Sequence, residues 1–170
     1  TYRFRKTGTL EEAFDDRVGV KLERQADGRC CKASGEFLSG QRRLSLAEVE
    51  QAEGNPVIVY YLEHDIREMQ RRTKGSANYF RKRIRMALYD GASITDVKFT
   101  YRGKAIDAQA ITIRPYRDDP NRARFAQLAD KRYVFVLSDA VPGSVVSIRS
   151  TAQADGSAAA LIDEELLLDG

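Results

Sequence analysis

The fold class is decided by residues 54–91, which read GNPVIVYYLEHDIREMQRRTKGSANYFRKRIRMALYDG. Asn55 is a favourable helix N-cap, and Pro56 suits the first helical position, where its missing N–H costs nothing. Apolar residues follow at helical spacing, namely Val59, Leu62, Ile66 and Met69. A periodicity of this kind predicts an amphipathic helix.

A second helix follows almost at once. Gly75 fits a helix C-cap and Ser76 the next N-cap. The apolar stripe of this second helix is formed by Ala77, Phe80, Ile84, Ala87 and Leu88. Because few residues separate the two stripes, the sequence predicts an antiparallel helical hairpin.

On both sides of this segment the apolar period changes from helical spacing to alternation. Alternating residues run through 18–22 and 95–101, and residues 133–137 are apolar at every position. These patterns are typical of half-buried strands and of a central strand, respectively. Asp-Gly pairs at 27–28 and 155–156 indicate hairpin turns. About eight strands are expected in all.

Two short helices are also expected. One runs from Leu44 to Gly54, where Ser45 and Glu48 have the spacing of a capping box. The other begins near Asp119, with Pro120 at its first position. Apart from these, the segments outside 54–91 have the pattern of strands and turns.

Strands, then helices, then strands in meander order predict an α+β fold. We expect a curved antiparallel β-sheet of about eight strands packed against a helical hairpin. Residues 1–170 would form a single domain, with a β-hairpin region at 1–40, a helical insert at 44–90 and an antiparallel meander at 94–168. A chain of 170 residues can bury a core without a disulfide or a metal.

The composition excludes few classes of protein. Apolar residues make up 42% and charged residues 31% of the chain, with a net charge of +3, which is ordinary for a folded domain. No apolar run is long enough for a membrane-spanning helix. Cys30 and Cys31 are adjacent, so a bond between them would be strained, and we expect two free thiols. The cysteines therefore do not indicate whether the protein is located in an oxidising or a reducing compartment.

Basic residues concentrate on the second helix, where Arg81, Lys82 and Arg85 lie opposite the apolar stripe. Any surface helix carries its charges there. A helix-turn-helix would need a third packing helix, whereas strands flank this pair. Nucleic-acid binding through helix 76–89 is therefore kept only as an alternative.

No catalytic or metal-binding motif is recognisable. His64 is the only histidine, and we expect it at the surface or at the rim of a site. A zinc site would need three or four ligands, so we predict no metal and no cofactor. Neither a G-x-S-x-G elbow nor a phosphate-binding loop occurs. A small enzyme with an unrecognised site stays an alternative, because acid–base catalysis needs only two well-placed groups.

Three stretches resemble segments of exported, uncharacterised proteins of Gram-negative bacteria. They are SANYFRKRIRMAL at 76–88, PYRDDPNRARF at 115–125 and YVFVLSDAVPG at 133–143. The resemblance covers the middle and C-terminal thirds of the chain. It implies a removed signal peptide and a periplasmic location, and it implies no activity.

These observations favour a non-catalytic binding protein. Helices on one face of a wide sheet leave either a packed core or a cleft, and clefts between layers are where ligands bind. The partner would be a lipid or another apolar small molecule, or a partner protein. The predicted ligand-facing residues are Leu62, Ile66, Phe80 and Ile84.

Overall fold

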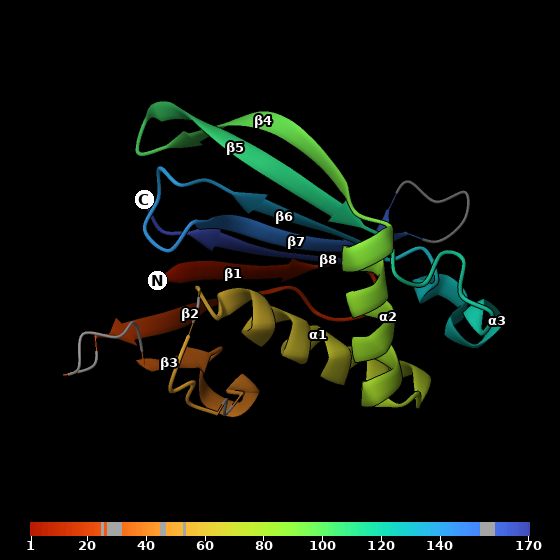
Figure 1. Ribbon diagram of the computed structural model, residues 1–170. Coiled ribbons are helices and arrows are strands. Elements are labelled where there is room, and N and C mark those ends of the chain that lie inside the picture. The colour runs from red at the N-terminus through yellow and green to blue at the C-terminus, as the bar shows by residue number, and fades with distance from the viewer. Residues whose placement is uncertain (25, 27–31, 45–46, 53, 154–158) are drawn as a thin grey trace.

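The chain folds into one antiparallel sheet with two long helices on one face, as the computed structural model shows (Figure 1). The structure describes residues 1–170 except 25, 27–31, 45–46, 53 and 154–158. The predicted turns at 27–28 and 155–156 and the cysteines Cys30 and Cys31 lie outside the described residues. The predicted α+β class, with a curved sheet and a helical pair, is confirmed.

Eight strands form the sheet within the described residues, in the order β3-β2-β1-β8-β7-β6-β5-β4. Because the two ends of the chain meet in the middle of the sheet, β1 pairs with β8. The strand bounds are β1 Tyr2–Thr7, β2 Phe14–Glu23, β3 Lys32–Phe37, β4 Ser93–Tyr101, β5 Lys104–Ile113, β6 Arg132–Leu137, β7 Val145–Gln153 and β8 Ala160–Leu168.

The two faces of the sheet differ in chemistry. Cross-strand partners share a face, and one such row crosses six strands as Phe4, Leu166, Ile148, Phe135, Ile111 and Ile94. The helices cover this apolar face. On the opposite face Arg149 pairs with Asp163, and Arg5 lies near Asp15. That face therefore carries solvated ion pairs, as an antiparallel sheet allows.

The long helices are α1, Val57–Thr73, and α2, Ala77–Asp90. Figure 1 shows α1 running along the strands while α2 turns across them, so the helices do not lie side by side as the short connection predicts. Asn55 Oδ1 accepts a hydrogen bond from the Val57 N–H, as expected of a capping residue. None of the described helices is long and apolar enough to cross a membrane.

The connection between these helices is capped differently from the prediction. Lys74, not Gly75, adopts the left-handed conformation that ends α1, with φ of 58°. A Cβ at Gly75 would lie 2.6 Å from the Phe80 ring. Gly75 is therefore required for the close approach of Phe80, which draws α2 against the end of α1.

The short helix predicted from Leu44 to Gly54 is wrong for the described residues of that segment. Leu44 and Val49 instead form bridges with Phe37 and Ala33 on the outer edge of β3. Backbone hydrogen bonds of 2.8 and 2.9 Å join Ala33 and Val49. Hydrogen bonding to the otherwise open edge of β3 is therefore favoured over the helix that the local capping signal predicts.

The second short helix is confirmed, but it is only four residues long. It is α3, Arg122–Phe125, followed by the 3₁₀ turn η2, Ala126–Leu128; a further turn, η1, spans Gly40–Arg42. Asp119 Oδ1 accepts a hydrogen bond from the Asn121 N–H, in the manner of a capping residue. The turn thereby brings Phe125 into the core beside Phe80.

The hairpin of β4 and β5 arches above the rest of the sheet (Figure 1). Its pairing register is regular from end to end. Near its base Ile113 is buried, whereas near its tip Phe99, Tyr101 and Ile106 on the other face are partly buried. Two-stranded ribbons twist strongly, and this twist explains the change of buried face without a bulge.

Candidate functional site

The apolar stripe of α1 is not covered along its whole length. Met69 and Ile66 are buried, and Leu62 is half-buried. Val59, one turn further toward the N-terminus, is 58% exposed. Tyr61, two residues further on, is fully buried, and two residues turn a helix by about 200°. Val59 therefore lies on the side of α1 that faces away from the sheet.

The stripe of α2 behaves in the same way in the opposite chain direction. Phe80 and Ile84 are buried, and Leu88, one turn further on, is 38% exposed. The Glu63–Arg81 ion pair marks where the two helices meet. Figure 1 shows the two helices diverging from this point toward the start of α1 and the end of α2.

The sheet adds an apolar residue to this region. Ile94 pairs with Ile111, which pairs with the buried Phe135, so Ile94 lies on the face that the helices cover. It is nevertheless 63% exposed. We use the term open corner for Val59, Leu62, Leu88 and Ile94, which are apolar residues of α1, α2 and β4 that are partly or largely exposed. Apolar residues that are exposed singly are common, whereas a contiguous exposed apolar patch marks a binding surface.

The sequence-predicted ligand-facing residues divide into two groups. Leu62 lies at the border of the open corner. Ile66, Phe80 and Ile84 are fully buried in the core between helices and sheet. A ligand would reach these three only if the helices moved, and their ligand-facing role stays a prediction. Val59 and Leu88 belong to the apolar stripes predicted for the two helices, and the sequence did not predict that they or Ile94 would be exposed.

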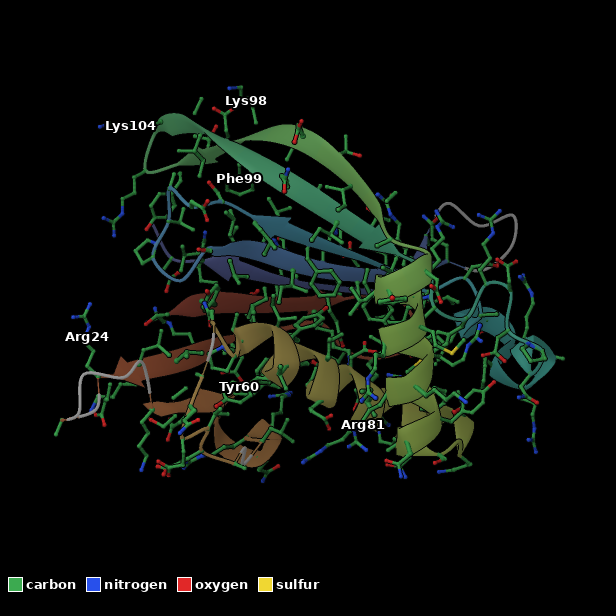
Figure 2. All side chains as sticks on the ribbon, in the orientation of Figure 1. Arg24, Tyr60, Arg81, Lys98, Phe99 and Lys104 are labelled. Atoms are coloured by element: carbon green, nitrogen blue, oxygen red, sulfur yellow. The ribbon has the colours of Figure 1, made fainter. Side chains whose placement is uncertain are left out.

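The predicted basic face is partly used within the protein. Arg81 donates to both carboxylate oxygens of Glu63 at 2.7 and 2.8 Å and lies between α1 and α2 (Figure 2). Arg83 pairs with Asp119 at 2.8 Å. Lys82 and Arg85 are exposed. The helix thus offers fewer unengaged charges to a nucleic acid than its composition indicates.

A charge network that the sequence analysis did not predict is buried beneath α1. Asp65 is fully buried, and it accepts hydrogen bonds from Lys131 Nζ and from the Tyr133 hydroxyl at 2.6 Å. Lys131 is itself buried. Burial, followed by the nearby Asp65 charge, raises the pKa of Tyr133 well above its ordinary value. The tyrosine therefore stays a hydrogen-bond donor.

A second part of the network surrounds Glu164 on β8. Lys6 lies 2.9 Å from the Glu164 carboxylate and 2.8 Å from that of Glu11. His64 Nε2 lies 3.7 Å from Glu164, and its ring packs against Phe4 and Phe37. The expected surface position of His64 is therefore wrong, since the ring is mostly buried beneath α1.

Two carboxyl groups of this network, those of Glu164 and Glu68, have lowered pKa values. Burial alone would raise the pKa of Glu164, but the nearby His64 and the charges of Lys131 and Lys6 outweigh burial and hold that pKa well below its usual range. Burial also opposes ionisation of Glu68, yet Arg71 and Lys6 lower its pKa to about 2. The charges that face one another under α1 thus compensate each other.

The burial of this network argues against a catalytic role. Asp65, Lys131, Glu164 and Lys6 are all inaccessible to solvent, so a substrate cannot contact them in this conformation. Over the part of the chain that the structure describes, no three His, Cys, Asp or Glu side chains are placed to hold a metal ion. We interpret the network as the means by which α1 is fixed on the sheet.

The network predicts a steep loss of stability in acid. A carboxyl whose folded pKa is lowered contributes stability above its ordinary pKa, and this contribution disappears as pH falls through the folded value. For Glu68 the interval is from 4.5 to about 2, which corresponds to a contribution on the order of 3 kcal/mol. The free energy of unfolding in urea should therefore fall between pH 5 and pH 2 (roughly the span of the two pKa values).

Glu68→Gln provides the control for this acid effect. The amide cannot titrate, so the variant should be less stable at pH 7 and should lose less stability over the same pH interval. An unchanged pH profile in the variant would show that Glu68 does not contribute in this way.

A pocket of about 410 Å³ lies on the other side of α2, near the start of β4 and the end of β5. Arg83 in its lining is already paired with Asp119. The remaining charged residues of the lining balance one another, namely Arg114 and Arg117 against Asp90 and Asp118. A selective anion or cation site would need an excess of one charge, so this pocket is a weaker candidate than the open corner.

The fold and the open corner define an α+β protein with one open antiparallel sheet, partly covered by two diverging helices. Comparison with known proteins finds no matching family model, no similar curated protein and no similar solved structure. The functional argument therefore depends on the residues of this chain.

Proposed function

We propose that the protein is a non-catalytic binding protein whose open corner takes an apolar small molecule, such as a lipid. The observation that carries the proposal is the exposure of three apolar residues, Val59 on α1, Leu88 on α2 and Ile94 on β4. Covering apolar surface is favourable by roughly 25 cal/mol per Å². A partner protein that covers the same residues is the alternative occupant.

The geometry supports a binding role over an enzymatic one. The chemically reactive groups beneath α1 are buried and mutually paired. The four residues of the open corner, in contrast, have apolar side chains. Such a surface can bind an apolar molecule but supplies no acid, base or nucleophile for chemistry.

The periplasmic location is part of the same proposal. It is supported by the resemblance of residues 76–88, 115–125 and 133–143 to segments of exported proteins of Gram-negative bacteria. Fractionation of cells that express the full-length protein tests it, and recovery in the cytosolic fraction would contradict it.

Binding of 1-anilinonaphthalene-8-sulfonate, followed by fluorescence, tests the open corner. Replacing Val59, Leu88 and Ile94 together with serine removes most of the exposed apolar surface of the corner. We expect the triple variant to bind the probe at least tenfold more weakly, equivalent to about 1.4 kcal/mol.

Leu22→Ser is the matched control, because Leu22 is also exposed but lies on β2, outside the open corner. This variant should bind the probe like the unmodified protein. Equal binding by the triple variant and the unmodified protein would contradict the proposal. Native mass spectrometry of the purified protein then tests whether an apolar molecule accompanies it.

A further inference from the structure

The two outer edges of the sheet are treated differently by the chain. The edge of β3 is paired with Leu44 and Val49. The edge of β4 forms the outside of the arch (Figure 1). Among the described residues, no backbone hydrogen bond from outside the β4–β5 ladder reaches β4. A nine-residue edge strand without proline or bulge is a template for pairing with another strand.

The turn at the tip of the arch determines which backbone groups of β4 point outward. Arg102 and Gly103 have φ of 49° and 73°, as a two-residue type I′ turn requires. Such a turn makes Tyr101 and Lys104 a hydrogen-bonded pair, so odd-numbered residues of β4 bond to β5. The N–H and C=O groups of Ile94, Asp96, Lys98 and Thr100 therefore point away from the sheet.

The sequence of β4 complements itself when two copies are antiparallel. With Val97 opposite Val97 of the second copy, Asp96 lies opposite Lys98 and Thr95 opposite Phe99. The pairs formed by even-numbered residues are then the hydrogen-bonded ones, as the outward backbone groups require. Opposite charges and β-branched–aromatic pairs across strands are favourable.

Lys98 does not block this contact. Edge lysines often prevent strand pairing because an unpaired charge would be covered. Here Lys98 already pairs with Asp107 across β5, and Asp96 accepts a hydrogen bond from Gln109 at 3.2 Å. Figure 2 shows Lys98 on the outside of the arch and Phe99 on its inside, so the charged row stays in solvent when a second strand is added.

We propose that the edge of β4 binds a second copy of this chain, forming a two-fold dimer centred on Val97 with a sheet continuous across both copies. The contact uses each β4 edge once, so it closes and does not propagate into a filament. It goes beyond the proposed ligand binding, because it requires only the edge of β4 and no occupant of the open corner.

Charge variants test the pairing in solution by sedimentation equilibrium at low ionic strength. Asp96→Lys places lysine opposite lysine, and Lys98→Asp places aspartate opposite aspartate. Each single variant should dimerise at least tenfold more weakly than the unmodified protein. An equimolar mixture of the two variants should form a heterodimer, because every charged pair across the contact is then attractive. Unfolding in urea verifies that both variants are folded.

Thr100→Pro supplies an independent test that leaves the charges unchanged. The Thr100 N–H points outward, so proline there removes a hydrogen bond of the dimer without breaking the β4–β5 ladder. We expect this variant to be monomeric. A monomeric unmodified protein at about 100 µM, well above the micromolar range of ordinary specific contacts, would overturn the proposal. So would single charge variants that dimerise as strongly as the unmodified protein.

Discussion

Replacement of Asp65 by alanine is expected to destabilise the protein by about 3–5 kcal/mol. Asp65 is the buried partner of both Lys131 and the Tyr133 hydroxyl. Its removal takes away the carboxylate that contacts the buried Lys131 ammonium group and that accepts the hydrogen bond from the buried Tyr133 hydroxyl. The free energy of unfolding from urea titrations at pH 7 measures this loss.

A double variant separates the cost of an unpaired charge from the value of the pair. Asp65→Leu combined with Lys131→Met replaces the ion pair by apolar groups of similar volume. Buried ion pairs exchanged in this way are often neutral or stabilised, so the double variant should regain most of the stability lost in Asp65→Ala. If the double variant is as unstable as the single one, the pair itself stabilises the fold, and our interpretation of Asp65 is wrong.

The sequence predicted the strands and long helices because their apolar periods are regular. It did not predict the charge network, although a signal was present in each element. Asp65 follows Tyr61 and precedes Met69 at four-residue spacing, so it occupies a core-facing helical position. Lys6 and Glu164 each continue an alternating apolar row of a strand. A charge at a buried position predicts that a partner exists, but the identity of that partner depends on the pairing of β1 with β8.

The segment from Leu44 to Gly54 shows a second limit of prediction from sequence, in which a clear local signal is overridden. Its local signals favour a helix, whereas the observed segment bonds to the edge of β3. Strand pairing between distant residues is decided by which edges stay open after the sheet has formed. Leu88 shows a similar limit. It has the periodicity of a core residue, yet it is 38% exposed in the folded chain.

The final prediction concerns Phe80, which lies near the start of α2 and is fully buried. Phe80→Ala should reduce the free energy of unfolding by about 3–5 kcal/mol, since a buried aromatic ring is lost and a cavity remains. The Phe80 ring lies 5.5 Å from that of Phe125 and 5.7 Å from that of Tyr116, and it contacts Gly75 in the connection from α1. Its removal therefore loosens the contacts that fix the start of α2.

Tyr89→Ala, on the same helix, is the control for Phe80→Ala, because this side chain is 88% exposed and its loss should change stability by less than about 0.5 kcal/mol. Urea unfolding of both variants gives the comparison. If Phe80→Ala and Tyr89→Ala lost similar amounts of unfolding free energy, Phe80 would not anchor the apolar stripe of α2. The conclusion that α2 is buried at its start and exposed at its end would then be wrong. A large loss only at Phe80 would support an α2 that is fixed to the core at its start and exposed at its end, where Leu88 lies.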